Sequence, residues 1–212
     1  MTNLAPSLDR TFLLTSISWE SYDRLLAIIG NQPVHLTYDR GLLELMSPSY
    51  NHERYKKRLG RLVEILTEEL NLPMIAGGSA TFRRQDLDRG LEPDECFYIQ
   101  NVAAVQGKAQ IDLAVDPPPD LVIEIDVASS SLDRMSIYAA MGVTEVWRYK
   151  DRELIFYQLD PTIRQYRSVT YSLTFAFLAA ADVIRFLQTY SESNDTELYR
   201  ALRSWIQRYY LE

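Results

Sequence analysis

The segment "PPPDLVIEIDVASSS", residues 117–131, constrains the fold of this chain more than any other. Successive side chains of a β-strand point to opposite faces of a sheet. One face of this strand would carry only apolar side chains, those of Leu121, Ile123, Ile125 and Val127. The other face would carry three acids around Val122, namely Asp120, Glu124 and Asp126. A strand with one solvated face has this pattern, and so does a strand that presents carboxylates to a functional site.

Hydrophobic periodicity predicts the elements around this strand. An N-terminal helix, a hairpin about residues 39–41 and a long helix over about residues 51–70 come before it. Further strands lie between residues 74 and 127, and a helix over residues 131–141, a hairpin about residues 150–152 and two closing helices follow. This order predicts an α/β fold with a mixed central β-sheet flanked by helices, as one domain over residues 1–212.

Composition limits the classes of function. The 29 acids against 22 bases give a net charge of −7, so nucleic acid could bind only through a local basic patch. The single cysteine, Cys96, excludes an internal disulfide and a Cys-rich zinc site, and is typical of a reducing compartment. The sequence contains no signal-peptide pattern and no run of 18 apolar residues. We therefore expect a cytoplasmic protein that does not bind membranes.

A second acidic segment, "LEPDECFYI", places Asp94 at the start of another predicted strand. If this strand lies beside the strand of Glu124, the Cβ atoms of the two acids would be roughly 5 Å apart. Two such carboxylates ionise together only at high cost unless a cation lies between them. Their oxygen atoms suit Mg²⁺ or Mn²⁺, which keep waters and substrate phosphate as further ligands. We expect Asp94 and Glu124 to bind such an ion, on a sheet face covered by the helix over residues 51–70.

These two acidic strands, together with "RMSIYAAMGVTEVWRY" over residues 134–149, resemble the Uma-two family of restriction-endonuclease-like proteins in the PD-(D/E)XK nuclease superfamily. The resemblance covers a core of about residues 38–187. It implies a restriction-endonuclease-like sheet on which Asp94 and Glu124 hold Mg²⁺ or Mn²⁺ for hydrolysis of phosphodiester bonds. The implied substrate is nucleic acid, with DNA favoured over RNA, and cutting both strands of a duplex would suit a homodimer.

One position departs from the superfamily motif, which has a lysine two residues after its second acid. This chain has Asp126 there, which could be a further ligand or orient water but cannot supply positive charge. Arg134 is the nearest basic candidate, although a solvated arginine at a helix start would look the same. On the long helix a helical wheel places His52, not Glu53, on the face toward the sheet, so His52 is a further catalytic candidate or else a packing histidine. His35 we expect to be structural.

Basic residues also cluster in "HERYKKRLGR" and at Arg83 and Arg84. They either contact phosphate or pair with nearby acids such as Glu64 and Glu68. Two classes of function follow. The first is a metal-dependent nuclease, which three acids on one strand face favour. The second is a catalytically degenerate relative that binds nucleic acid or protein, which the missing lysine and the net negative charge favour.

Overall fold

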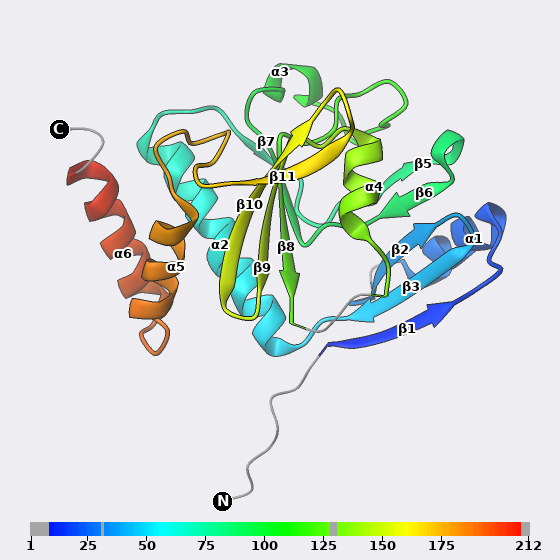
Figure 1. The fold of residues 1–212 in the computed structure, drawn as a ribbon, viewed down its shortest axis with the longest axis horizontal. Helices are drawn as coiled ribbons and strands as arrows, with labels where there is room; N and C mark the ends of the chain where they lie inside the picture. The colour runs from blue at the N-terminus through cyan, green and yellow to red at the C-terminus, as the bar shows by residue number, and fades with distance from the viewer. Residues whose placement is uncertain (1–8, 31, 128–130, 209–212) are drawn as a thin grey trace, which may run out of the picture.

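Two β-sheets organise the structure, a computed structural model that describes residues 9–30, 32–127 and 131–208 (Figure 1). The first sheet has the strand order β1-β3-β2-β6-β5, and all its neighbouring strands are antiparallel. Helix α1 (Trp19–Ile29) packs on it through Tyr22, which stacks on Tyr38. The strands are β1 (Arg10–Leu14), β2 (His35–Asp39), β3 (Leu42–Ser47), β5 (Phe82–Arg84) and β6 (Arg89–Leu91).

The second sheet has the strand order β11-β10-β9-β8-β7-β4. Only the pair β8–β9 is parallel, so this sheet is mixed, as predicted. Its strands are β4 (Ile75–Ala76), β7 (Glu95–Tyr98), β8 (Leu121–Asp126), β9 (Glu145–Lys150), β10 (Glu153–Asp160) and β11 (Gln165–Val169). The remaining helices are α2 (Tyr50–Glu69), α3 (Val102–Val105), α4 (Arg134–Met141), α5 (Ala180–Thr189) and α6 (Asp195–Ile206).

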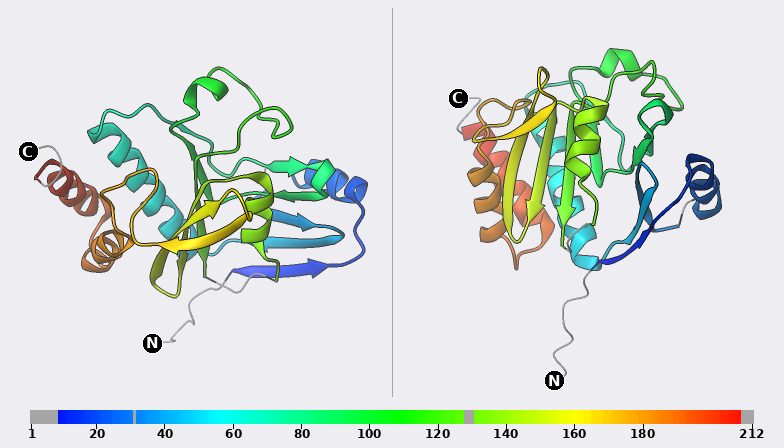
Figure 2. Two further views of the ribbon diagram at one scale, coloured as in Figure 1. Left: turned by 45° about the horizontal axis from the view of Figure 1, so that its top comes forward. Right: turned by 45° about the vertical axis from the view of Figure 1, so that its right-hand side comes forward.

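The two faces of the second sheet are covered by different helices (Figure 2). Helices α2, α5 and α6 share one hydrophobic core with the apolar face of β8, where Leu121, Ile123 and Ile125 lie. Helix α4 packs on the other face, where Ile137 and Met141 join Val122 of β8 in a second core.

The prediction that α2 covers the acids is therefore wrong. Leu59, Leu62, Val63 and Leu66 of α2 are almost completely buried. Such an apolar stripe gains most by burial against the apolar face of the sheet, so the acids of β8 are left to the shorter helix α4.

Local signals placed the elements well, whereas the division into two sheets was not predicted. Both expected hairpins form, and the turn residues Asp151 and Arg152 of the second have positive φ, as a two-residue hairpin requires. Strand β1 was missed, because "RTFLL" is largely exposed and shows no alternation. Within the described residues, no helix combines the length and the apolar character needed to cross a membrane.

Candidate active site

The strands of Asp94 and Glu124 are neighbours in the second sheet, as predicted. Glu95 of β7 pairs with Ile123 of β8, and the same antiparallel register places Asp94 opposite Glu124. Both acids are buried, with 1 % and 4 % of their surfaces exposed, so the interpretation of a solvated strand face is wrong. Together with Asp126 they line a cavity of about 20 Å³. Its other lining residues are Asp9, Thr11, Glu44, Met46, Ile125 and Arg134.

A chain of hydrogen bonds fixes the carboxylate of Asp94. Its Oδ2 accepts from the backbone N–H of Ile125 at 2.7 Å, and its Oδ1 lies 2.9 Å from Nε2 of His52. The other ring nitrogen of His52, Nδ1, lies 2.9 Å from Oδ2 of Asp9. Oδ1 of Asp9 in turn accepts from the backbone N–H of Ser49 at 2.7 Å. His52 therefore bridges two carboxylates, one from each side.

The charge of His52 follows from these contacts. Burial lowers the pKa of His52, but its hydrogen bonds to Asp9 and Asp94 and the negative charges of these acids outweigh burial and raise that pKa to about 10. A protonated imidazole donates from both nitrogens, which matches its two carboxylate partners. The side chain is fully buried, as the helical wheel predicted, while Glu53 pairs with Lys56 outside the cavity. With both nitrogens occupied, His52 can hold Asp94 in position but has no free atom for a substrate.

Glu124 is held by helix α4. Its Oε1 accepts from Nη2 of Arg134 at 2.8 Å and from the hydroxyl of Tyr138, and its Oε2 lies 2.7 Å from Nε of Arg134. Burial raises the pKa of Glu124 to about 7; the charge of Arg134 opposes this rise, and the charge of Asp94 adds to it. At neutral pH Glu124 therefore takes up a proton far more readily than an exposed glutamate does.

Arg134 is not the solvated helix-start arginine that the sequence alternatively allowed. It is 9 % exposed, and its guanidinium also donates to Oγ1 of Thr37 at 2.6 Å and to the carbonyl oxygen of Glu92 at 2.7 Å. These contacts connect α4 to both sheets. They place a permanent positive charge beside Glu124, in the cavity where the motif lacks its lysine.

Asp126 of β8 and Asp120, which directly precedes β8, have separate partners. Asp126 accepts from Nε of Arg148 at 2.7 Å and is also paired with Nη2 of the same arginine. Asp120 lies outside the cavity, and its Oδ2 accepts three backbone N–H groups at 2.7, 2.8 and 3.0 Å, those of Ile99, Gln100 and Asn101. Asp120 therefore closes a loop, and Asp126 faces the site as half of an ion pair.

The basic clusters of the sequence are paired with acids. Arg61 contacts Glu64 at 2.8 Å and Glu68 at 3.0 Å, while Arg58 is almost fully buried and contacts Asp195 at 2.8 Å. The pairs Arg83–Asp23 and Arg84–Asp86 complete this pattern. Most of the positive charge of these clusters is therefore paired with acids, while Arg54 donates to the carbonyl oxygen of Ser191.

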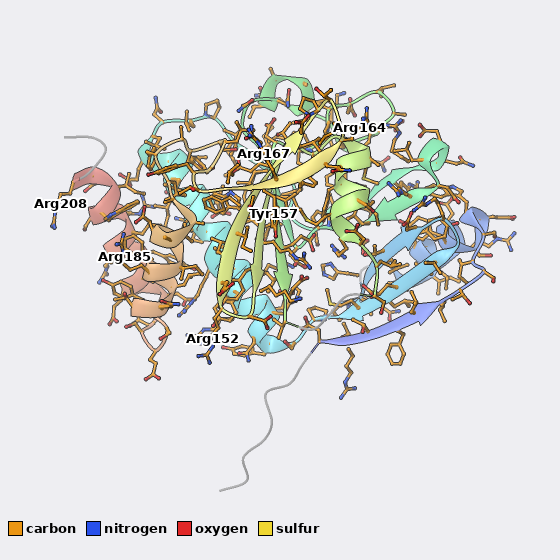
Figure 3. The ribbon with its side chains drawn as sticks, in the orientation of Figure 1. Arg152, Tyr157, Arg164, Arg167, Arg185 and Arg208 are labelled. Atoms are coloured by element: carbon orange, nitrogen blue, oxygen red, sulfur yellow. The ribbon has the colours of Figure 1, made fainter. Side chains whose placement is uncertain are left out.

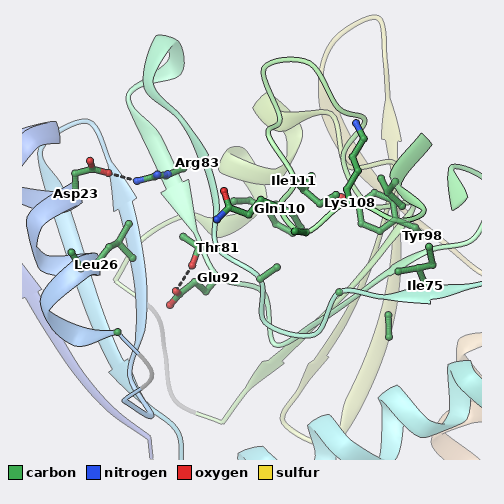
Figure 4. A pocket seen from close by; sticks show the side chains of 18 residues that line it. Asp23, Leu26, Ile75, Thr81, Arg83, Glu92, Tyr98, Lys108, Gln110 and Ile111 are labelled. Carbon is green, nitrogen blue, oxygen red and sulfur yellow. Dashed lines mark hydrogen bonds and ion pairs between the residues drawn. The ribbon is translucent and has the colours of Figure 1, made fainter. Parts of the chain in front are cut away.

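A much larger hollow, of about 800 Å³, lies between α1, β5 and the segment at residues 105–111 (Figure 4). Its charged side chains already have partners. Arg83 points to Asp23, and Glu92 accepts from the hydroxyl of Thr81 at 2.7 Å and from the backbone N–H of Leu36 at 2.9 Å. None of the acids of β8 lines this hollow, so the cavity of Asp94 and Glu124 is the candidate active site.

Four residues of the site were missed from the sequence: Asp9, Glu44, Tyr138 and Arg148. Tyr138 could have been found, because it lies four residues after Arg134 and thus on the same face of α4. Glu44 lies on β3 of the first sheet, and Asp9 directly precedes β1 of the same sheet. The sequence does not predict this sheet.

Comparisons with known proteins identify the family and the fold of this chain. A family model named Uma2 and described as "Putative restriction endonuclease" matches residues 19–189. The chain belongs to the Uma2 family. The match includes His52, Asp94, Glu124, Asp126 and Arg134, whereas Asp9 lies before it. No curated protein matches the chain.

One solved structure similar to this Uma2 chain is that of "a putative nuclease belonging to DUF820" from Anabaena variabilis ATCC 29413. The two chains are 14 % identical, with a TM-score of 0.53, and the match covers 77 % of this chain and 96 % of the other. At this identity the likeness shows a shared fold. It confirms the predicted α/β fold class of a restriction-endonuclease-like core.

Proposed function

We propose that this Uma2 protein is a nuclease that hydrolyses phosphodiester bonds of nucleic acid, DNA in preference to RNA, with Mg²⁺ or Mn²⁺. One observation carries the proposal: Asp94 and Glu124, from neighbouring strands, line a single buried cavity together with the guanidinium of Arg134. Carboxylates that can hold a cation beside a fixed positive charge are what the developing charge of phosphoryl transfer requires.

The donor set fits a hard divalent ion. Mg²⁺ is commonly held through one or two carboxylates and keeps several waters or phosphate oxygens. Among the side chains that the structure describes, no group of three or more His, Cys, Asp and Glu is placed to hold a metal ion. Asp94 and Glu124 would therefore bind the ion as a pair and leave the rest of its coordination shell to water and substrate.

The charge balance of the cavity also favours a divalent ion. Five carboxylates line it, those of Asp9, Glu44, Asp94, Glu124 and Asp126. Three cationic side chains contact these acids, those of His52, Arg134 and Arg148. Burial raises the pKa of Glu124 and the negative charge of Asp94 adds to that rise, so a cation bound between these two carboxylates would lower the cost of ionising both.

Each side chain would have a distinct task in the reaction. A bound ion would polarise a phosphoryl oxygen and lower the pKa of a water. Asp9 and His52 keep Asp94 ionised and oriented, and Tyr138 holds Glu124. Arg134 can stabilise negative charge on the phosphate, although a guanidinium cannot accept a proton.

A thermal-shift titration with MnCl₂ tests the proposal. An ion that binds only the folded protein stabilises it by about 2.7 kcal/mol at 100 times its dissociation constant. We expect the wild-type melting temperature to rise with Mn²⁺, and Asp94→Asn and Glu124→Gln to lose that rise relative to their own metal-free values. Asp120→Asn is the matched control, because Asp120 is an acid that directly precedes β8 but lies outside the cavity.

The same proteins are then assayed for Mn²⁺-dependent cleavage of supercoiled plasmid and of short single- and double-stranded DNA and RNA. Cleavage by wild type and by Asp120→Asn, but not by the two cavity variants, would support the nuclease. A wild-type protein that neither binds Mn²⁺ nor cleaves any of these substrates would refute it. Metal binding without cleavage would favour the degenerate binding module instead.

A further inference from the structure

A second hollow opens on the α4 face of the second sheet, beside the candidate active site. Its volume is about 630 Å³, which is within the range of small-molecule and nucleotide pockets. Residues of α4, β9, β10 and the start of β11 line it. Its charged and aromatic lining residues are Arg89, Asp133, Arg148, Tyr157, Arg164 and Tyr166.

This hollow is adjacent to the active site, because wall residues are shared along the way. Between the two lies a small recess of about 50 Å³. The recess shares Glu124, Asp126 and Arg134 with the catalytic cavity. It shares Asp133, Met135 and Arg148 with the larger hollow. A strand bound in the hollow would therefore be separated from the recess that Glu124 lines only by the side chains of Asp133, Met135 and Arg148.

The charge of the hollow contrasts with that of the whole chain. Three arginines and one acid line it, in a protein whose net charge is −7. Arg89 is paired with Asp39 at 2.9 Å and Arg148 with Asp126. Arg164 is exposed and donates to the carbonyl oxygen of Ala140 at 3.1 Å, but it has no acidic partner within the part of the chain that the structure describes. Its guanidinium is therefore available to an anion.

We propose that this hollow binds the sugar-phosphate backbone of the nucleic-acid strand beside the bond to be cut, with Arg164 as its phosphate contact. A guanidinium fork matches the geometry of phosphate oxygens, and a neighbouring aromatic ring offers a surface for a base or sugar. Tyr157 of β10 supplies that ring, and Figure 3 labels it together with Arg164, which lies in the turn between β10 and β11. The inference rests on the proposed function, because it takes nucleic acid as the substrate.

The neighbouring strand offers a matched control in Arg167. This arginine, labelled in Figure 3, is also exposed and lies three residues from Arg164. It donates to Oε1 of Gln158 at 3.1 Å. Gln158 pairs with Arg167 across the strands, and it follows Tyr157 on β10. Because side chains alternate along a strand, Gln158 and Arg167 lie on the face opposite to Tyr157. Loss of either arginine changes the net charge equally, but only Arg164 lines the hollow.

The experiment measures binding of fluorescent oligonucleotides, single- and double-stranded DNA and RNA, by anisotropy in EDTA over 50–300 mM salt. Arg164→Gln is compared with Arg167→Gln and wild type. Arg164 has a positive φ of 50°, and glutamine is strained there no more than arginine, so the variant should fold. Loss of one phosphate contact should weaken binding about three- to tenfold near 0.1 M salt and make the slope of log K against log salt shallower by about 0.9 for duplex and 0.7 for single strands.

The outcomes separate this inference from the proposed function. Weaker binding and a shallower salt slope in Arg164→Gln alone would support the hollow as the strand-binding site. Equal effects in both variants, no effect in either, or a wild type that binds none of the oligonucleotides would overturn it. If Arg164→Gln binds weakly but wild type with Mn²⁺ cleaves nothing, the strand site stands and the nuclease fails. If wild type cleaves and Arg164→Gln behaves as wild type, the nuclease stands and the strand site fails.

Discussion

Replacing Arg134 with methionine tests whether this arginine is what makes the buried charge of Glu124 tolerable. Methionine fills a similar volume but removes the ion pair and the hydrogen bond to Glu124. Removing one partner of a buried pair costs about 3–5 kcal/mol, because the other charge stays buried without compensation. At about 2–4 °C per kcal/mol for a chain of this size, the melting temperature should fall by about 6–20 °C at pH 8.

The stability lost in Arg134→Met should depend on pH, and the environment of Glu124 determines the direction of that dependence. The pKa of Glu124 is about 7 in the folded protein and has a reference value of 4.5, so the folded state binds this proton more tightly than the unfolded state. Between pH 4.5 and 7 the unfolded state has released this proton while the folded state keeps it, so the free energy of unfolding falls as pH rises through this range. Without Arg134 the pKa rises further, and the loss of stability continues above pH 7. Loss of the bonds to Thr37 and Glu92 should destabilise the variant at every pH, and the unpaired Glu124 should add up to about 1.4 kcal/mol between pH 7 and pH 8, one pH unit above its wild-type pKa.

Urea denaturation followed by circular dichroism between pH 5 and pH 8 measures this difference. Arg24→Met is the control, because Arg24 pairs with Glu20 in full exposure to solvent and should change stability by less than about 1 kcal/mol. The double variant Glu124→Gln/Arg134→Met should recover much of the loss at pH 8, since no buried charge remains. An equal loss at pH 5 and pH 8 would refute the reasoning, because the unpaired group could not then be Glu124.

Two further predictions concern His52 and Asp120. His52→Gln should destabilise the protein most below pH 6.5 and least above pH 10, because the raised pKa of about 10 gives His52 a stabilising contribution that is lost as pH rises through that value. Urea denaturation at pH 6 and pH 10 measures this dependence. A loss of stability that is the same at both pH values would contradict the imidazolium bridge. Asp120→Asn should lower the free energy of unfolding by about 1–3 kcal/mol, because it weakens the contacts to the loop, while the thermal shift with Mn²⁺ stays intact. Loss of that thermal shift in this variant would show that the loop at residues 99–101 also positions the metal site.

The faces of the strands could be predicted from the sequence, because side chains alternate with a period of two and each residue is thereby assigned to one face. The alternation in residues 120–127 correctly separated the apolar face of β8 from its acidic face, and the start of β7 correctly placed Asp94 beside Glu124. A helix gives less information, since its apolar stripe shows that it packs on a sheet but not on which face. The apolar stripe of α2 packs on the apolar face of β8, and not on the acidic face that the sequence-based expectation assigned to it.

The first sheet could not be predicted in the same way. It pairs β1 with β3 and β2 with β6, strands that are far apart in the sequence, and two of its strands have only three residues. Local periodicity cannot reveal such pairings. Asp9 and Glu44 reach the cavity only because this sheet lies against the acidic edge of the second, so their roles were not visible in the sequence.

The missing lysine shows how a site can keep its charge when its motif changes. Asp126 occupies the lysine position, yet two guanidiniums lie next to the acids of β8. One comes from Arg134 at the start of α4, and the other from Arg148, which is the register partner of Glu124 on the parallel strand β9. An arginine is longer than a lysine and forms a planar fork, so it can reach a carboxylate from an adjacent element. Its guanidinium stays protonated at any pH at which the protein is folded, whereas a lysine in a buried site can release its proton. In the proposed nuclease, Arg134 would supply the electrostatic part of the lysine's contribution but could not accept a proton, so a carboxylate or water would have to act as the base.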